Sequence, residues 1–251
     1  MKGIILAAGL GTRLRPLTYA VTKCCLPVQG KPMIYHSIEK FVNVGIRDIL
    51  IIASTDSIEA LAKCVGSGDS LDCKIHFTIQ EKPLGLSHAV LMGKEFVGNS
   101  SFIMLLGDNF FEDSLRTVKD TLSFSSCVLA TKQVPNPQDY GVLELNKDGT
   151  PKEIFEKPAN PTSNQAVVGI YGYDPTVFSV IETLKPSARG ELEITDLNNN
   201  LLKAGVANFV ELKGYWVDIG SVESYEKANR LTPTKGDWPV IEDVIDYNWE
   251  F

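Results

Sequence analysis

The sequence contains neither a long hydrophobic run nor an excess of positive charge. Its first apolar stretch, residues 4–8, is far too short to cross a bilayer, and no basic segment precedes it as in a secretory signal peptide. We therefore expect no membrane association and a cytoplasmic location. The formal net charge is −7, so a broad electrostatic surface for nucleic acid is not expected. An anionic ligand would have to be bound by a few local cations and backbone N–H groups.

The sequence also has no recognisable pattern of metal-binding or redox-active cysteines. Their number is odd, and their spacings match neither a zinc site nor a dithiol motif. Free thiols in a reducing cytoplasm are the prediction for all five. The three histidines follow no catalytic pattern and receive no role. The cysteines are Cys24, Cys25, Cys64, Cys73 and Cys127.

Short β-rich runs alternate with longer helical patterns, which is typical of βαβ units. Hydrophobic residues make up 44% of the chain, enough for a substantial core. The pattern predicts an α/β fold with a Rossmann-like, doubly wound mixed sheet and a small β-rich insertion. Strands are expected at 2–7, 48–54, 74–80, 101–106, 127–134, 141–145, 153–156, 166–173 and 208–212. Helices are expected at 32–44, 56–65 (capped by Asp56), 86–97, 115–124, 176–184, 193–204 and 222–231.

A glycine-rich loop follows the first predicted strand. Gly9 and Gly11 allow positive φ angles and a close approach, so that consecutive backbone N–H groups can face phosphate oxygens. Arg13 adds a cation, and Lys23 follows a few residues later. A dinucleotide-binding turn would need a third glycine where Leu14 stands, and the Gly-Lys-Ser/Thr ending of a phosphate-binding P-loop is absent. A purely structural turn and a solvated Lys23 remain the alternatives.

Asp108 follows an almost wholly apolar strand. A carboxylate at this place is either a helix cap or a ligand at the carboxyl edge of a parallel sheet, where the sites of α/β proteins gather. From the residues alone both interpretations stay open.

These pieces together resemble the sugar nucleotidyltransferases, above all the short-form glucose-1-phosphate thymidylyltransferases. Each motif alone is weak, but their order over about 230 residues is specific. The resemblance rests on residues 2–14, Thr22-Lys23, 26–28, 80–86, 106–109, 140–142, 156–158, 190–196 and 216–220.

The resemblance implies a reaction and a set of site residues. A sugar 1-phosphate attacks the α-phosphorus of a nucleoside triphosphate in line and releases pyrophosphate, with Mg²⁺ bound by Asp108 and Asp218. Arg13, Lys23 and the two aspartates are expected to carry catalysis. The nucleotide is expected at Leu6, Gly9, Gly11, Thr12, Arg13, Lys23, Gln80, Gly85 and Asp108. The sugar phosphate is expected at Asn109, Gly141, Glu156, Lys157, Val168, Tyr171 and Arg189. Glu156-Lys157 could alternatively be a plain charged pair before a turn.

The resemblance also implies an organisation and a substrate pair. A single domain, 1–231, would have a nucleotide-binding part at about 1–135 and a sugar-binding part at about 136–231, followed by a tail at 232–251. The expected substrates are dTTP and glucose 1-phosphate. Ala8 leaves UTP open as the nucleotide, and a homo-oligomer is expected. A nucleotide-sugar sensor without catalysis and a Rossmann oxidoreductase are the alternatives from other classes.

Overall fold

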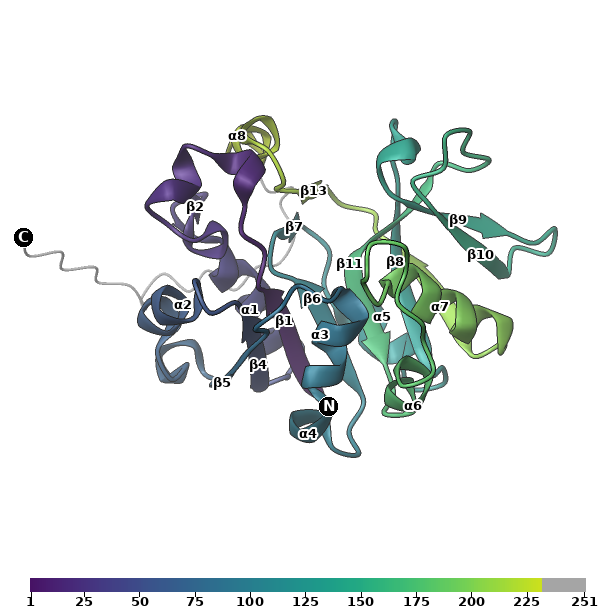
Figure 1. The fold of residues 1–251 in the computed structure, drawn as a ribbon, viewed down its shortest axis with the longest axis horizontal. Helices are drawn as coiled ribbons and strands as arrows, with labels where there is room; N and C mark the ends of the chain where they lie inside the picture. The colour runs from purple at the N-terminus through teal and green to yellow at the C-terminus, as the bar shows by residue number, and fades with distance from the viewer. Residues whose placement is uncertain (232–251) are drawn as a thin grey trace, which may run out of the picture.

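A computed structural model of the chain describes residues 1–231, so the expected tail at 232–251 lies outside the described residues. Four parallel strands form one half of a mixed sheet, in the order β6-β1-β4-β5 (Figure 1). They are β1 (Lys2–Ala7), β4 (Asp48–Ala53), β5 (Lys74–Ile79) and β6 (Phe102–Leu106). β1, β4 and β6 are nearly continuous apolar runs because both faces of the sheet are covered there, whereas β5 at the edge is more polar and only partly buried.

The long strand β11 (Gln165–Tyr173) joins this half to the rest of the sheet. It runs antiparallel to β6 on one side, and also to β8 and β9. β12 pairs in parallel with β8, and β10 forms a hairpin with β9. The mixed α/β fold is therefore confirmed, and one sheet continues through the expected division near residue 135. These strands are β8 (Cys127–Gln133), β9 (Gly141–Leu145), β10 (Pro151–Glu156) and β12 (Ala207–Glu211).

Helices cover the two faces of the sheet and bury two separate hydrophobic cores. In β1, Ile5 and Ala7 point to one core, whereas Ile4 and Leu6 point to the other, as the two-residue period of a strand requires. The first core is covered by α1 (Met33–Val42), α2 (Ile58–Val65) and α5 (Arg116–Thr121). The second is covered by α3 (Leu86–Met92), α4 (Lys94–Val97), α6 (Val177–Ile181) and α7 (Ile194–Lys203).

A third core joins the two ends of the described chain. The last helix, α8 (Val222–Arg230), lies beside the hairpin of β2 (Pro27–Val28) and β3 (Lys31–Pro32) at the top of Figure 1. The Tyr225 hydroxyl donates to the Pro27 carbonyl at 2.7 Å. Leu14, Val28 and Ala228 are fully buried in this core. A second short ladder, between β7 (Asn109–Phe111) and β13 (Trp216–Asp218), lies next to it.

Two sequence-based expectations about helices were wrong. The helix expected at 86–97 is interrupted at Gly93, where a β-carbon would come within 2.7 Å of Ile4 Cδ1. Glycine therefore lets the backbone at the junction of α3 and α4 pack closely on β1. The second error concerns α2, which is preceded by Ser57 rather than capped by Asp56. The Ser57 hydroxyl accepts from the backbone N–H of Ser54 at 3.0 Å and stabilises this turn.

None of the described helices has both the length and the apolar character needed to span a lipid bilayer.

Candidate active site

The glycine-rich loop leaves β1 at the carboxyl edge of the sheet and continues into three short 3-10 turns, Thr12–Leu14, Leu17–Tyr19 and Lys23–Cys25. Gly11 has a φ of +62°, and a β-carbon there would lie 3.1 Å from both Thr18 Cγ2 and Lys23 Cβ. Thr18 donates from its hydroxyl to the Gly11 carbonyl at 2.7 Å. This compact packing fixes the loop, whereas Gly9 is open, since a β-carbon there would meet no atom of the described residues within 4 Å.

Lys23 is buried and paired with Asp108. Its side chain is 9% exposed, and Nζ lies 2.6 Å from Oδ2 of Asp108. The interpretation of Lys23 as a solvated surface lysine is therefore wrong. A buried ammonium group is costly unless a negative charge faces it, so this pair needs both partners.

Asp108 and Asp218 come together through the ladder of β7 and β13. Asp218 pairs with Asn109 in this ladder, and the Ile219 N–H donates to the Asp108 carbonyl at 2.9 Å. No helix follows Asp108, since β7 begins at the next residue, so the helix-cap interpretation is also wrong. Burial and the charge of Asp108 raise the pKa of Asp218 to about 6.

Three cations act electrostatically on Asp218, and one of them, Lys23, contacts Asp108 directly. The guanidinium of Arg13 lies against Gly220, where a β-carbon would be 2.9 Å from Nη2. The positive charges of Lys23, Arg13 and Lys157 oppose the rise in the pKa of Asp218. Lys157 adopts a φ of +43°, and its backbone N–H donates to the Tyr140 carbonyl at 3.0 Å. The loop, β7, β13 and the turn after β10 thus contribute to one charged centre.

The two carboxylates fit a divalent cation that is completed by substrate. Among residues 1–231 there is no group of three or more metal-binding side chains. Two aspartates with phosphate oxygens and water are a typical donor set for Mg²⁺. The raised pKa of Asp218 comes first from burial and then from the nearby charge of Asp108, and a divalent cation between the two carboxylates would offset both effects.

The predicted base-binding residues lie at the end of β5 and the start of α3. Gln80 follows β5, is 9% exposed, and its Nε2 lies 3.3 Å from the Gly85 carbonyl. Gly85 has a φ of +98°, and a β-carbon there would lie 2.4 Å from the carbonyl oxygen of Leu192. Leu6 lies at the end of β1, and its carbonyl accepts from the Gly107 N–H at 2.9 Å.

The segment at 187–193 supports the loop that carries the predicted base-binding residues, and sequence reasoning missed this support. Leu192 donates from its N–H to the Leu84 carbonyl at 2.8 Å and accepts from the Ser87 N–H at 3.1 Å. The Ser87 hydroxyl donates to the Glu193 carbonyl at 2.9 Å. The motif at 190–196 therefore has a structural task, and it lies directly beside Arg189, for which a role toward the sugar phosphate is expected.

Asn109 is buried and makes three hydrogen bonds. Its Nδ2 donates to Oδ1 of Asp108 at 2.9 Å, while its Oδ1 accepts from the Gly169 N–H and from Trp216 Nε1 at 3.1 and 2.7 Å. The side chain thus orients Asp108, and Trp216 is a contributor that the sequence did not indicate. The role of Asn109 toward the sugar phosphate stays a prediction.

A second group of predicted residues gathers around Glu156. Its carboxylate accepts from the Thr195 hydroxyl at 2.8 Å and would lie 3.3 Å from a β-carbon at Gly141. Arg189 is exposed and pairs with Glu193 at 2.9 Å. The charge of Glu156 also acts on Arg189 and on the buried hydroxyl of Tyr171.

Val168 and Tyr171 lie inside the protein. Val168 is 1% exposed and Tyr171 4%, and their side chains belong to different cores. Burial and the nearby carboxylate of Glu156 raise the pKa of the Tyr171 hydroxyl. At Val168, the buried side chain cannot reach a ligand, so only its backbone could make such a contact.

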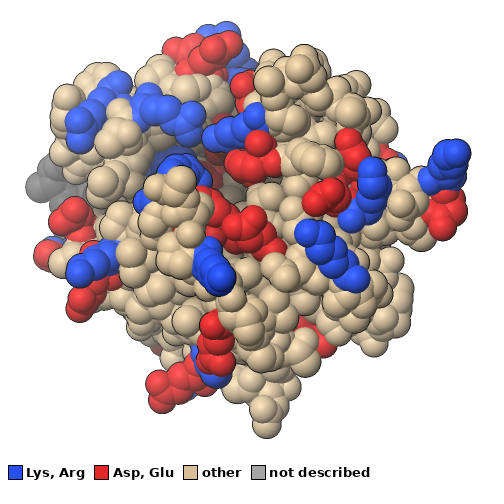
Figure 2. All heavy atoms as spheres, turned by 45° about the vertical axis from the view of Figure 1, so that its right-hand side comes forward, with Lys and Arg blue, Asp and Glu red and all other residues tan. Residues whose placement is uncertain are grey.

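Charged side chains of both signs are interspersed around a recess in Figure 2. A groove of about 750 Å³ opens beside Asp218 and is also lined by Tyr140 and Trp216. None of the seven predicted sugar-phosphate residues is among the described residues that line it.

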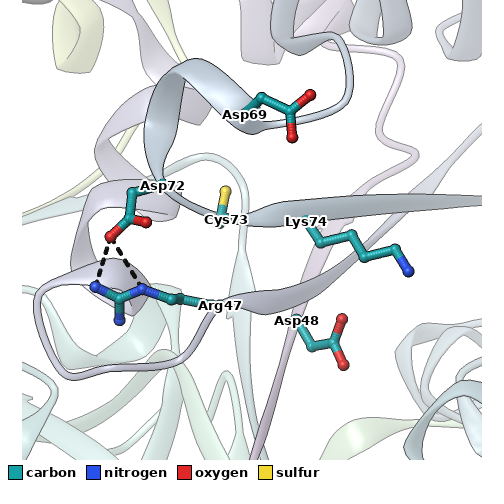
Figure 3. Close-up of a pocket in the computed structure, with 6 residues that line it drawn as sticks. All are labelled: Arg47, Asp48, Asp69, Asp72, Cys73 and Lys74. Atoms are coloured by element: carbon teal, nitrogen blue, oxygen red, sulfur yellow. Dashed lines mark hydrogen bonds and ion pairs between the residues drawn. The ribbon is translucent and has the colours of Figure 1, made fainter.

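A separate pocket lies at the opposite edge of the sheet, where β4 and β5 begin (Figure 3). Arg47 and Asp72 form an exposed ion pair there at 2.6 Å. This pocket contains none of the predicted site residues. It therefore plays no part in the candidate site.

Comparison with known proteins agrees with this geometry. The sequence model of the family described as Nucleotidyl transferase matches residues 2–235. Glucose-1-phosphate thymidylyltransferases from Neisseria meningitidis and Streptomyces griseus are each 40% identical to the chain, over 93% and 92% of its length. The chain spans 83% of the first relative and 66% of the second.

Two solved structures share the fold. A protein from Bacillus anthracis, assigned as a glucose-1-phosphate thymidylyltransferase and bound to sucrose, matches with a TM-score of 0.87 and 42% identity. The match covers 91% of this chain and 94% of that one. A UDP-glucose pyrophosphorylase bound to UDP-glucose matches with a TM-score of 0.80 and 27% identity, over 91% and 96%. With its glycine-rich loop, its paired carboxylates and a family match over nearly its whole length, the chain belongs to the nucleotidyl transferase family.

Proposed function

We propose that the chain is a glucose-1-phosphate thymidylyltransferase, which joins dTTP to α-D-glucose 1-phosphate and releases pyrophosphate. The observation that carries the proposal is the convergence of Arg13, Lys23 and Lys157 on Asp108 and Asp218 at the end of the glycine-rich loop. The relatives with this name, at about 40% identity, support the choice of reaction.

The chemistry requires two anions to approach each other. The phosphate oxygen of the sugar attacks the α-phosphorus in line, and negative charge develops on the departing pyrophosphate. Arg13 and Lys23 hold the triphosphate and stabilise that charge, and the glycine-rich loop supplies backbone N–H groups. No side-chain nucleophile is needed, because the sugar phosphate is itself the nucleophile.

Asp108 and Asp218 would hold Mg²⁺. An ion held there would supply positive charge against the triphosphate and a fixed position for its α-phosphate. Asn109 keeps Asp108 in place through the 2.9 Å hydrogen bond from Nδ2. Lys23 balances the charge of Asp108 before the substrates arrive.

Gln80 and Gly85 read the base, and the residues around Glu156 hold the sugar phosphate. Glu156 accepts hydroxyl hydrogen bonds from the sugar, while Lys157 and Arg189 are cations for its phosphate. Arg189 is exposed and its guanidinium group pairs with the carboxylate of Glu193. To bind the phosphate, Arg189 must therefore give up one of its contacts with this carboxylate.

The test is an assay of pyrophosphate release with dTTP, UTP, CTP and ATP against several sugar 1-phosphates. We expect the highest kcat/KM with dTTP and glucose 1-phosphate, and no turnover without a divalent metal. A clear preference for UTP would reassign the chain as a uridylyltransferase. Absence of turnover with every pair would leave a nucleotide-sugar sensor, and a preference for CTP or ATP would overturn the proposal.

We also propose a cytoplasmic enzyme that forms a homo-oligomer. All five cysteines are free thiols, as is usual in a reducing compartment. Light scattering after size-exclusion chromatography measures the oligomeric state directly, and the mass of a monomer at micromolar concentration would contradict this part of the proposal.

A further inference from the structure

The amide of Gln80 is held from two sides. Its Nε2 lies 3.3 Å from the Gly85 carbonyl oxygen and 3.2 Å from Nδ1 of His88, in the first turn of α3. A carbonyl oxygen can only accept a hydrogen bond, so the amide nitrogen must be the atom that faces Gly85. Nδ1 of His88 then accepts the second N–H of the same amide, with the ring proton on Nε2.

The amide oxygen of Gln80 is left free by this arrangement. No described residue donates to Oε1, and no buried side-chain polar atom among residues 1–231 lacks a partner. Since Oε1 has no partner and every fully buried polar atom has one, Oε1 must be accessible to a ligand. The residue as a whole is nevertheless only 9% exposed. The side chain offers an acceptor, not a donor, to whatever binds beside it.

We propose that His88 is a specificity-determining residue, which fixes the Gln80 amide so that its Oε1 selects a base with an N3–H group. Thymine and uracil carry a proton on N3, whereas cytosine carries a lone pair there. Cytosine would therefore place the lone pair of its N3 against Oε1 of Gln80. Both acceptors would be left without a donor, and this cost disfavours cytosine relative to thymine and uracil. This inference rests on the proposed function, because it takes Gln80 as the residue that reads the base.

The Gly85 carbonyl, which accepts from the Gln80 amide, is held firmly in place. Gly85 is confined by Leu192, whose carbonyl oxygen would lie 2.4 Å from a β-carbon at this position, and its own carbonyl also accepts from the Ala89 N–H at 3.2 Å. A rotated Gln80 amide would direct Oε1 at the Gly85 carbonyl oxygen, and it would also face a lone pair on Nδ1 of His88 unless the ring proton moved there from Nε2. The histidine contributes one of the two bonds that oppose this rotation, so its loss should weaken the selection without abolishing it.

A matched pair of variants separates the acceptor from the shape of the side chain. In His88→Asn an oxygen can stand at the place of Nδ1, whereas His88→Leu has the same branching at Cγ but no acceptor. Calorimetric binding of dUDP and dCDP is the readout, because these nucleotides differ only at the edge of the base that includes N3. The measurement needs no turnover, so it is independent of whether the proposed reaction is correct.

We expect the wild-type protein to prefer dUDP, His88→Leu to reduce the preference about 5-fold to 10-fold, and His88→Asn to retain most of it. In the activity assay the change should fall on the KM for the triphosphate rather than on kcat. Equal behaviour of the two variants, or a wild-type protein without preference between dUDP and dCDP, would overturn the inference. Wild-type discrimination in binding combined with absence of turnover would overturn only the proposed function.

Discussion

The ammonium group of Lys23 lies 2.6 Å from a carboxylate oxygen of Asp108, although 85 positions separate the two residues in the chain. The contact joins the turn after the glycine-rich loop to the end of β6. It places a buried cation between the glycine-rich loop and one of the two carboxylates that we propose to hold the metal ion.

Replacement of Lys23 by methionine keeps the aliphatic stem and removes the charge. We expect kcat/KM for pyrophosphate release to fall about 100-fold or more, because a cation that stabilises charge in the transition state is lost. Lys63→Ala is the control, since Lys63 forms an exposed pair with Glu59 on α2. A decrease smaller than about threefold for Lys23→Met would remove this residue from catalysis.

Asp108→Asn should abolish metal-dependent turnover and leave the fold intact. The amide keeps the size of the side chain but binds Mg²⁺ poorly and does not balance the charge of Lys23. Asp72→Asn, at an exposed ion pair, should leave activity unchanged. Activity is to be measured over a range of Mg²⁺ concentrations and the fold by circular dichroism. Near-normal turnover of Asp108→Asn would contradict the metal-binding role.

Stability should fall at acidic pH because of His36. Burial against Phe110 lowers the pKa of this ring from 6.5 to about 4, and the charges of Lys31 and Lys40 act in the same direction, while the contact of Nε2 with the Val28 carbonyl opposes them. The unfolded chain therefore binds a proton before the folded protein does. The free energy of unfolding is at its full value above pH 6.5 and decreases as the pH falls toward 4, by up to about 3 kcal/mol.

Urea unfolding between pH 4 and pH 7 measures this dependence. In His36→Gln the amide can still donate to the Val28 carbonyl but does not titrate, so this part of the slope should disappear. The same pH dependence in the variant and the wild type would show that another group is responsible.

Gly85→Ala should destabilise both the fold and the loop that we propose to bind the base. The new β-carbon would lie 2.4 Å from a backbone oxygen at a φ of +98°, so we expect a loss of about 2 kcal/mol or more in the free energy of unfolding. Gly149→Ala is the matched control, because φ is +84° there but the space is open. Thermal unfolding and nucleotide binding are the measurements, and equal losses in both variants would exclude the contact with Leu192 as the cause.

The sequence was sufficient to predict most of the sheet, because its strands are strongly apolar and bounded by clear turns. β1, β4 and β6 lie within a residue or two of their expected ranges. The expected helix at 86–97 failed at Gly93, since the close approach to Ile4 is a tertiary contact that no local pattern encodes. Nor could any pattern predict that β11 would connect both parts of the sheet.

The candidate site shows the same limit. The family resemblance indicated Asp108 and Asp218, but their proximity depends on two three-residue strands, β7 and β13, which are too short to give a periodic signal. The position of His88 beside Gln80 depends likewise on the turn between β5 and α3. The backbone support from Leu192 comes from a segment more than a hundred residues away. Such long-range contacts are fixed by packing rather than by spacing.

The third hydrophobic core has a consequence for synthesis of the chain. It combines Leu14 and Val28 from the beginning with Val217 and Ala228 from the end of the described residues, and Asp218 lies in the same late segment. A nascent chain that has emerged only as far as β12 has the complete glycine-rich loop but lacks the second carboxylate and the helix that packs against β2. Because we propose that Asp218 helps to hold the metal ion, we expect a fragment that ends at β12 to release no pyrophosphate from a triphosphate.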